Sequence, residues 1–307
     1  MATPEIAVKS LEELCKNKEI DVCAVVTQPD RPKGRGNKLT PPPVKLCACE
    51  NNIVCYQTEK ISKDENLIKR LKEIKPDFIV TFAFGQILSQ EVLDIPVFST
   101  VNLHASLLPK YRGANPIQRC IYNGDCETGI STMLTVLSLD AGDICQTDKI
   151  DITENMNDVE LKEIISQKSP KLICSTLKGL YEGKLIPYKQ DELGVTIAKK
   201  FNKEDGLINW NNKASNIHNQ VRSMVDFPTA YTFINGKKIK ILETRVTEKS
   251  KNITAGEIYS VTKAGIEVAA IEGNILIIKV KPENKGIMNA YDYANGAKLK
   301  SGIKMGE

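Results

Sequence analysis

The chain has 307 residues, of which 41% are hydrophobic and 26% charged, with 42 Lys and Arg against 38 Asp and Glu. This length favours about two domains, and a net charge of +4 is too small to indicate a nucleic-acid-binding protein by itself. No apolar run reaches the roughly 18 residues of a membrane span, and no leader peptide is recognisable, so we expect a cytoplasmic protein without membrane attachment.

The nine cysteines follow no regular spacing. An odd number of cysteines without a secretory leader favours reduced thiols. Cys47, Cys49 and Cys55 raise the question of a metal site, but neither a histidine nor a second Cys pair at ligand spacing accompanies them. We therefore expect no metal and assign these thiols to packing.

Residues 1–185 alternate between helix and strand patterns. The helix patterns lie at 5–17, 64–74 and 157–184, and we expect the last of them to bend or break around Pro170. The strand patterns lie at 20–26, 77–83, 99–105 and 130–137. Such alternation is typical of an α/β fold with a doubly wound, mostly parallel sheet covered on both faces.

A basic loop, residues 27–45, interrupts this alternation with the sequence TQPDRPKGRGNKLTPPPVK. A loop of this length inside a compact domain is usually functional or disordered. It lacks the Gly-Lys-Ser/Thr ending of a phosphate-cradling P-loop. Its five Lys and Arg against one Asp favour an arm that contacts the phosphates of a larger partner.

After residue 185 we expect a linker, residues 186–202, and then a smaller domain, residues 203–307. A helix pattern at 212–224 precedes five short strand patterns, and Asn235-Gly236 is a strong hairpin signal. Five short strands close together favour an OB-like β-barrel. This domain has 16 Lys and Arg against 11 Asp and Glu, which fits a solvated surface and a phosphate-binding surface equally well.

Three polar residues form a candidate site. Asn102 and His104 lie two positions apart at the end of the strand pattern 99–105, so their side chains point to the same side. Asp140 follows the pattern 130–137, and we expect it past the carboxyl end of a neighbouring strand. Amide, imidazole and carboxylate together suit acyl transfer. Alone, an Asn-x-His pair at a strand end is more often structural, and Ser106 lacks the surroundings of a nucleophile.

The segment NLHASLLPKYRGANPIQ, residues 102–118, resembles the signature of enzymes that use 10-formyltetrahydrofolate. This signature is shared with glycinamide ribonucleotide and sugar-nucleotide formyltransferases. The basic loop and the segment from Lys199 to Ile241 resemble the methionyl-tRNA formyltransferase family specifically. The likeness runs from Ala2 almost to the C-terminus.

The resemblance implies transfer of a formyl group from 10-formyltetrahydrofolate to the α-amine of methionine on initiator Met-tRNA, by a monomer. It implies catalytic roles for Asn102, His104 and Asp140. The folate contacts that it implies are Phe84, Gly85, Gln86, Ile87, Ser106, Leu107, Leu108 and Pro109. The tRNA contacts that it implies are Lys33, Arg35, Lys38 and the C-terminal domain. The family usually has Tyr in place of Phe84, a change that keeps the ring and from which we expect little effect.

One departure from the family concerns the amino terminus. Members begin with an apolar strand that leads into GTPE or a close variant, whereas this chain starts MATPE. The first strand of a doubly wound sheet is central, so we expect two strands without their partner and an unfilled space in the core. We interpret Met1 as an internal methionine of a longer protein.

Two alternatives stay open at this point. One is another user of formyl-folate, either a sugar or nucleotide N-formyltransferase or a hydrolase, which would need neither the basic loop nor a basic barrel. The other is a non-catalytic RNA-binding relative. The presence of Asn102, His104 and Asp140 weighs against the second.

Overall fold

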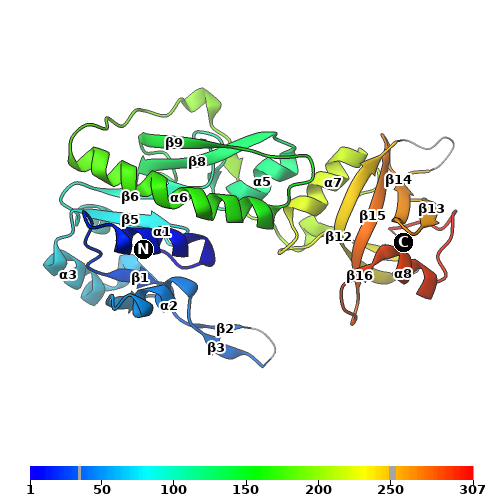
Figure 1. Cartoon of the computed structure of the whole chain (residues 1–307), viewed down its shortest axis with the longest axis horizontal. Coiled ribbons are helices and arrows are strands. Elements are labelled where there is room, and N and C mark those ends of the chain that lie inside the picture. The colour runs from blue at the N-terminus through cyan, green and yellow to red at the C-terminus, as the bar shows by residue number, and fades with distance from the viewer. Residues whose placement is uncertain (34–35, 249–253, 307) are drawn as a thin grey trace. The chain divides into compact units, whose positions relative to one another are not determined.

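The computed structural model describes residues 1–33, 36–248 and 254–306. These residues form two compact units (Figure 1). Unit 1 comprises residues 1–116, 127–151 and 162–198, and unit 2 comprises residues 117–126, 152–161 and 199–307. The segment 186–198, expected as a linker, thus belongs to unit 1.

Unit 1 contains short helices and strands in alternation. Its strands are β1 Val25–Thr27, β2 Arg31–Lys33, β3 Lys38–Thr40, β4 Cys55–Gln57, β5 Phe78–Phe82, β6 Ser99–His104, β7 Arg112–Gly113, β8 Glu127–Leu134, β9 Ile144–Asp151 and β10 Ile197–Ala198. Its helices are α1 Val8–Lys16, α2 Pro43–Glu50, α3 Glu65–Ile74, α4 Gln90–Leu93 and most of α6 Asp158–Tyr181. The α/β class predicted from the alternating patterns is confirmed.

The strands of unit 1 are parallel in one part and antiparallel in another. β1 pairs with β4, and β5 with β6, both in parallel, whereas β8 runs antiparallel to β6 and β9 antiparallel to β8. β8 and β9 are joined directly by the loop 135–143. Without a crossover helix, consecutive neighbouring strands can pair only in the antiparallel direction. The sheet therefore contains more antiparallel pairing than the sequence patterns predicted.

The first two residues lie between the two parallel pairs. The Ala2 amide donates to the Val26 carbonyl of β1 (3.1 Å), and the Phe82 amide of β5 donates to the Met1 carbonyl (3.1 Å). Met1 and Ala2 thus link β1 to β5 over a length of two residues.

The longest helix, α6, continues through Pro170, so of the bend or break predicted there the break does not occur. Proline removes one backbone donor from the helix. The neighbouring Ser169 hydroxyl donates to the Ile165 carbonyl (2.6 Å), and Leu161, Ile165 and Ile173 are fully buried. Packing of this apolar face holds the helix together despite the missing donor.

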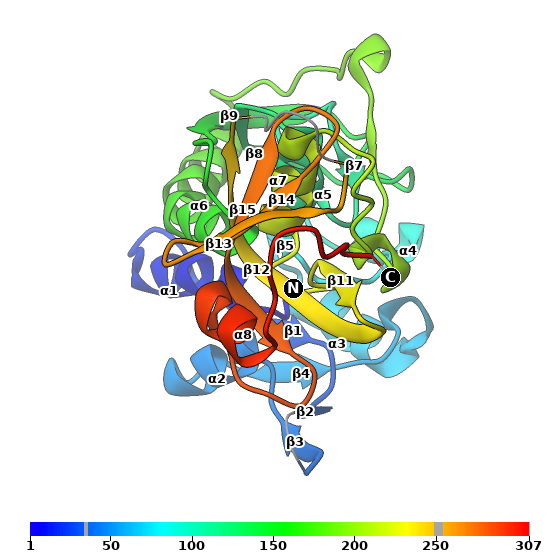
Figure 2. The ribbon, with the colours of Figure 1, turned by 90° about the vertical axis from the view of Figure 1, so that its right-hand side faces the viewer.

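Unit 2 is built on an antiparallel sheet. Its strands are β11 Tyr231–Ile234, β12 Lys237–Thr247, β13 Ile258–Thr262, β14 Gly265–Ala269, β15 Asn274–Pro282 and β16 Met288–Asn289. Its helices are most of α5 Pro116–Asn123, α7 Ala214–Ser223 and α8 Ala290–Gly296. The sheet order is β11-β12-β15-β14-β13, with β16 beside β15, and the long strands β12 and β15 lie side by side (Figure 2).

The hairpin predicted at Asn235-Gly236 is confirmed, because it joins β11 to β12 and both residues have positive φ (51° and 71°), as a type I′ turn requires. Within the described residues no strand pairing joins β11 to β13. The antiparallel sheet is therefore present. The C-terminal segment 303–306 bonds to both of its edges, since the Met305 amide donates to the Gly256 carbonyl beside β13 (2.7 Å) and the Gly306 amide donates to the Phe233 carbonyl of β11 (2.8 Å). Its inner face packs on α7 through Ile217, Val221 and Ile239.

Candidate active site

Asn102 is oriented by a residue of the neighbouring strand. Its side-chain oxygen Oδ1 accepts a hydrogen bond from the Thr81 hydroxyl of β5 at 2.7 Å. Thr81 is buried, and β5 and β6 are paired in register at these two residues. Because the amide oxygen is engaged by Thr81, the amide nitrogen Nδ2 is turned the other way and is the group that can donate to a ligand.

His104, at the end of β6, is buried between two acceptors. Its Nε2 lies 2.8 Å from the Tyr111 carbonyl oxygen, and its Nδ1 lies 3.6 Å from Asp140 Oδ2. A carbonyl oxygen only accepts, so Nε2 carries a proton. The Nδ1 distance is longer than a hydrogen bond but within ion-pair range. With an acceptor facing each ring nitrogen, the arrangement suits the positively charged imidazolium.

Asp140 is held by the backbone of β7. Its Oδ2 accepts from the Gly113 amide at 2.8 Å, and its own backbone has the left-handed φ of 49°. Gly113 has a φ of 115°, and a Cβ at this position would lie 2.9 Å from the Ala198 carbonyl oxygen. Glycine therefore allows β10 to approach β7 closely, which places the Gly113 amide against the carboxylate.

Asp140 lies near His104, but the chain brings it there by a different route from the one expected. The expectation was that Asp140 follows the carboxyl end of a strand parallel to β6. β8 runs antiparallel to β6: Ser131 pairs with His104, and Leu134 pairs with Val101. The carboxyl end of β8 therefore lies beside the amino-terminal half of β6, away from His104. The loop 135–143 between β8 and β9 brings Asp140 back to His104.

A residue that the sequence did not single out, Gln190, secures this loop. Its amide nitrogen donates to the carbonyl oxygens of Asp140 (2.8 Å) and Gly142 (2.7 Å). Its amide oxygen accepts from Nε of Arg112 (3.0 Å), a buried side chain that also pairs with Glu192 (2.8 Å). No local pattern in the sequence pointed to Gln190, since its partners Arg112, Asp140 and Gly142 are distant along the chain.

The turn after β6, residues 106–109, is tied to β8 through Ser131. The Ser131 hydroxyl donates to the Ser106 carbonyl (2.7 Å) and accepts from the Leu108 amide (3.0 Å). Ser106 is fully buried, and its hydroxyl donates to the Lys110 carbonyl (2.6 Å). Leu108 packs with Met133 and Ile144. The Ser106 hydroxyl is therefore engaged within the turn.

The segment 84–87 follows β5. The Phe84 ring is buried in a core cluster with Leu71 of α3, and the Phe84 carbonyl accepts from the side-chain Nε2 of Gln28 (3.0 Å). The Gln86 side chain is bonded within unit 1, to the Ile61 amide (2.7 Å) and the Thr58 carbonyl (2.8 Å). Gly85 has a φ of 76°, and the side chain of Ile87 is 79% exposed.

Comparison with known proteins places this chain among formyltransferases. The family described as formyl transferase matches residues 2–177, and the formyl transferase C-terminal domain matches residues 200–298. A methionyl-tRNA formyltransferase of Clostridium acetobutylicum is 44% identical over 303 residues, which cover 99% of this chain and 97% of that protein. A methionyl-tRNA formyltransferase of Citrifermentans bemidjiense is 42% identical over 307 residues, which cover 100% of this chain and 95% of that protein. The chain belongs to the methionyl-tRNA formyltransferase family.

Solved structures of other formyltransferases share the fold of this chain. An N-formyltransferase from Helicobacter canadensis, in complex with folinic acid and dTDP-3-aminofucose, superposes with a TM-score of 0.68 at 20% identity, covering 90% of this chain and 96% of that one. A sugar 3N-formyl transferase superposes with a TM-score of 0.66 at 20% identity, covering 93% and 97%. At 20% identity these two structures establish the fold. The resemblance to the methionyl-tRNA formyltransferase family is confirmed by the relatives that are 44% and 42% identical.

The basic loop of this family member forms a hairpin of β2 and β3, with Lys33 and Lys38 paired in register. Lys45 at its end pairs with Asp30 (2.8 Å), and Arg31 pairs with Glu59. Lys38 is exposed and forms no ion pair with a described residue. Of the three predicted tRNA contacts, Arg35 lies outside the described residues. Lys38 is described in full, and Lys33 is described by its backbone.

A second basic surface, which the sequence did not identify by residue, lies on the outer face of the sheet of unit 2. We call it the basic face, and it consists of Tyr231, Phe233, Lys238, Lys240 and Lys281. Lys240 stands opposite Lys281 on the adjacent strand, and the Lys238 ammonium lies 3.5 Å from the centroid of the Tyr231 ring. Burial, followed by the charges of Lys281 and Lys238, lowers the pKa of Lys240. Like charges opposite each other destabilise a sheet, and their convergence favours an anionic ligand.

The thiols show no grouping for a metal. Within the described part of the chain, no three His, Cys, Asp or Glu side chains come together as ligands. Burial raises the pKa of the Cys47 thiol to about 11 and that of the Cys145 thiol to about 12, which keeps both protonated near neutral pH. Among the helices described, none has both the length and the apolar character needed to cross a bilayer.

Proposed function

We propose that this protein transfers the formyl group of 10-formyltetrahydrofolate to the α-amine of methionine on initiator Met-tRNA, in the cytoplasm, for translation initiation. The observation that carries the proposal is the grouping of Asn102, His104 and Asp140 in a chain 44% identical to a protein named for this activity. Amide, imidazolium and carboxylate are groups that suit acyl transfer without a covalent enzyme intermediate.

In the proposed reaction the methionine amine attacks the formyl carbon, a C–N bond forms, and the carbonyl oxygen becomes an oxyanion. Asn102 Nδ2 donates to this oxyanion because Thr81 occupies the amide oxygen. Removal of one such donor typically costs about 10²–10³ in rate. The positive charge of His104, held by Asp140, stabilises the same oxygen.

The bond from the formyl carbon to N10 of the folate then breaks, and the proton released by the amine ends on N10. His104 as the imidazolium gives one proton to N10 and then takes up the proton that the amine releases, or a water placed by Asp140 passes the proton from the amine to N10. General acid–base assistance of this kind contributes about 10²–10⁴ in rate. The carboxylate of Asp140 stays ionised throughout, since its role is to hold the imidazolium in place.

For the folate we infer contacts through the backbone of the segments 84–87 and 106–109. The Phe84 ring and the Ser106 hydroxyl are buried within unit 1, and the Gln86 amide is bonded to Ile61 and Thr58. The groups left for a ligand are backbone N–H and C=O groups, the exposed Ile87 side chain and the half-buried side chains of Leu107 and Pro109. This also supports the expectation that the Phe84 ring without a hydroxyl changes little.

For the tRNA we infer two contact regions, one on each unit. The β2–β3 hairpin with Lys33, Arg35 and Lys38 is the first, and the basic face of unit 2 is the second. Both offer Lys and Arg side chains to phosphates, and the aromatic rings of the basic face offer stacking surfaces. A single chain supplies both regions together with the catalytic residues, so we infer a monomer.

The test is a formylation assay with purified protein, 10-formyltetrahydrofolate and Met-tRNA, read as formyl-methionyl-tRNA. Replacing Met-tRNA by uncharged tRNA, by no acceptor or by a dTDP-linked amino sugar should abolish formyl transfer and folate turnover. The His104→Ala variant should lose at least about 10²-fold in kcat while its thermal unfolding stays near that of the parent. Near-normal formylation by His104→Ala, or a preference for the amino sugar, would overturn the proposal.

A further inference from the structure

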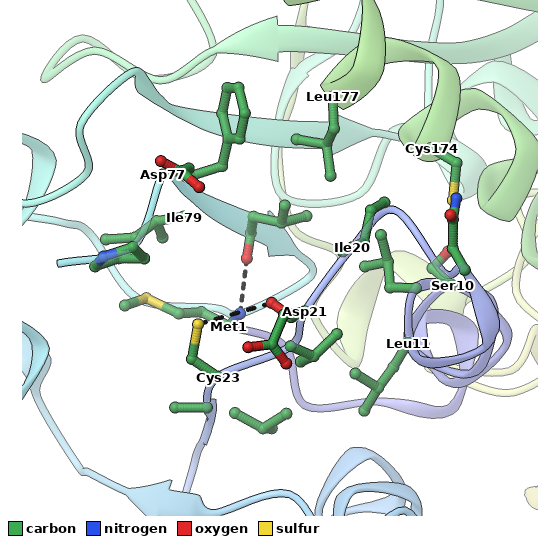
Figure 3. A pocket seen from close by; sticks show the side chains of 18 of the residues that line it. Met1, Ser10, Leu11, Ile20, Asp21, Cys23, Asp77, Ile79, Cys174 and Leu177 are labelled. Carbon is green, nitrogen blue, oxygen red and sulfur yellow. Dashed lines mark hydrogen bonds between the residues drawn. The ribbon is translucent and has the colours of Figure 1, made fainter. Parts of the chain in front are cut away.

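Two features of unit 1 take no part in the proposed reaction. One is the unfilled space expected in its core, a cavity of about 620 Å³ beside Met1 that is lined mostly by apolar side chains (Figure 3). The other is a cluster of hydrogen-bonded side chains at the base of the basic loop. This cluster is connected both to the β2–β3 hairpin and to the segment 84–87, the regions inferred to contact the tRNA and the folate.

The cluster joins the two ends of the basic loop. Asp30 directly precedes β2, and Lys45 lies in the first turn of α2, after the hairpin. The Lys45 ammonium donates to both carboxylate oxygens of Asp30, at 2.8 and 3.0 Å. The hydrogen bonds from Lys45, followed by that from Gln57, lower the pKa of Asp30. A cation in the first turn of a helix is unfavourable for the helix dipole, so Lys45 requires an anion of this kind nearby.

Gln57, at the end of β4, attaches this ion pair to the sheet. Its amide oxygen accepts from Lys45 Nζ (2.7 Å), and its amide nitrogen donates to Asp30 Oδ1 (2.8 Å). A single amide thus serves the cation and the anion together, and it does so in only one orientation. We call Asp30, Lys45 and Gln57 the clasp. Within the clasp, Lys45 serves the structure of the loop itself.

Gln28 connects the clasp to the folate segment. Its carbonyl oxygen accepts from the amide nitrogen of Gln57 (2.9 Å), and its own side-chain nitrogen donates to the Phe84 carbonyl (3.0 Å). Gly85 permits this approach, because its φ is 76° and a Cβ there would lie 2.7 Å from Gln28 Nε2. Hydrogen bonds therefore run without interruption from the base of the hairpin to the segment 84–87.

The clasp contributes little to the overall stability of unit 1. The side chains of Asp30 and Lys45 are both 28% exposed, and ion pairs in contact with water are weak. Holding three long side chains in one arrangement also costs rotamer entropy. The clasp does determine the direction in which the hairpin leaves the sheet, because it joins the residue before β2 and a residue after β3 to the end of β4.

We propose that the clasp positions the β2–β3 hairpin for the tRNA, and that Gln28 sets this position relative to the folate segment. The proposal rests on the function proposed above. The clasp residues and Gln28 are positioning residues, since they act through the hairpin and the segment 84–87. A hairpin that already has the direction needed for the tRNA loses less conformational entropy on binding, so the clasp strengthens the binding of Met-tRNA.

The variant Asp30→Ala tests the clasp, because charge and position predict opposite results for it. Removing an acidic group adds one net positive charge beside the hairpin, and charge alone would strengthen binding to phosphates. Loss of the clasp releases the base of the hairpin and should weaken binding. Glu50→Ala, at an exposed position at the end of α2, adds the same charge and leaves the clasp intact.

We expect Asp30→Ala to weaken Met-tRNA binding in filter retention by about 5- to 20-fold and to raise KM for Met-tRNA by a similar factor. Its kcat at saturating Met-tRNA and its KM for 10-formyltetrahydrofolate should stay within about twofold of the parent. Glu50→Ala should bind Met-tRNA at least as tightly as the parent. Unchanged or stronger binding by Asp30→Ala would overturn the proposal.

The variant Gln28→Ala tests the connection to the folate segment. It removes the donor to the Phe84 carbonyl, and we expect KM for 10-formyltetrahydrofolate to rise by about 3- to 10-fold, together with KM for Met-tRNA. The matched control is Gln167→Ala, an exposed glutamine of α6 whose amide donates to Glu163 (2.8 Å), and both KM values should stay at the parental level. An unchanged KM for the folate in Gln28→Ala would contradict the role of Gln28.

Hydrogen exchange tests the clasp without formyl transfer. In Asp30→Ala the amides of the β2–β3 hairpin should exchange about 10-fold faster, while those of β12 and β15 in unit 2 stay as in the parent. If Asp30→Ala lowers Tm, Gln57→Met replaces it, because this variant keeps the ion pair and removes its attachment to β4. Faster hairpin exchange without formylation by any variant would refute the proposed function alone. Parental hairpin exchange in variants that formylate normally would refute the clasp alone.

Discussion

The side-chain amide of Gln190 bridges the carbonyl oxygens of Asp140 and Gly142, at 2.8 and 2.7 Å, while its oxygen receives Arg112. A residue 50 positions further along the chain thus holds the loop that carries the site's carboxylate. This bridge holds the backbone of the loop, while the Gly113 amide holds the Asp140 carboxylate itself, and together they place Asp140 beside His104.

The first prediction is that Gln190→Ala lowers kcat by about 10- to 100-fold, since displacement of a catalytic group by about 1 Å is enough for such a loss. KM for Met-tRNA should change little, because Gln190 is buried and lies on neither tRNA contact region. Steady-state formylation measures both constants. Lys189→Ala, at an exposed neighbouring position, is the matched control and should behave like the parent. Equal kcat for both variants would show that Asp140 does not need this bridge.

A second prediction concerns the orientation of Asn102. Thr81→Val keeps the shape of the side chain and removes the hydroxyl that donates to Asn102 Oδ1. The amide is then free to turn its oxygen toward the oxyanion, and we expect kcat to fall about 5- to 10-fold. Thr81→Ser retains the hydroxyl and should recover most of the activity. If the Ser variant is as slow as the Val variant while both unfold near the parental Tm, the hydroxyl is not what orients Asn102.

The third prediction concerns the basic face of unit 2. Lys240→Ala and Lys281→Ala should each weaken tRNA binding and lower the slope of log affinity against log salt by about 1, the value for one phosphate contact. Lys263→Ala, an exposed lysine between β13 and β14, should leave both quantities unchanged. Binding is measured by filter retention of Met-tRNA between low and physiological salt. Equal slopes for all three variants would place the tRNA elsewhere.

These contacts also show what the sequence could predict. Asn102 and His104 were predictable because the period of a strand places residues two apart on one side. The pairing of Asp140 with His104 was predicted, but through a parallel strand that does not exist, since no local pattern distinguishes a parallel β8 from an antiparallel one. Gln190 could not be found at all, because its role depends on tertiary contacts with loops that are distant in sequence.

The assignment of α5 to unit 2 also could not be predicted from the sequence, because it depends on tertiary contacts. α5 lies in the middle of the predicted catalytic domain, yet Gln118 in this helix donates to the carbonyl oxygens of Ser223 (3.0 Å) and Phe227 (2.7 Å). Ser223 is 105 positions away. The helix pattern was visible in the sequence, whereas its partner was not. Amphipathic spacing predicts that a face is buried and does not specify against what.

The last prediction contrasts the two histidines. His218 in α7 is buried, its Nδ1 lies 2.9 Å from the Thr244 hydroxyl, and its Nε2 lies 3.2 Å from the Glu154 carbonyl oxygen. The neutral ring satisfies both contacts, donating through Nε2 and accepting at Nδ1. Burial is the main cause that lowers the pKa of His218, and the positive charges of Arg222 and Arg245 add to it. His104, by contrast, has the carboxylate of Asp140 beside its Nδ1.

Because the unfolded chain takes up a proton at His218 near pH 6.5 and the folded chain does so only at lower pH, unit 2 loses stability as the pH falls below about 6.5. Above about pH 7.5 the histidine is neutral in both states and contributes no pH dependence. The chain's single tryptophan, Trp210, is buried in the core of unit 2, so its fluorescence in a urea titration reports this unit. His218→Gln keeps a donor and an acceptor without a titrating group. We expect the difference in urea midpoint between pH 5.5 and 7.5 to shrink in this variant, and an unchanged difference would mean that other groups cause the acid sensitivity of unit 2.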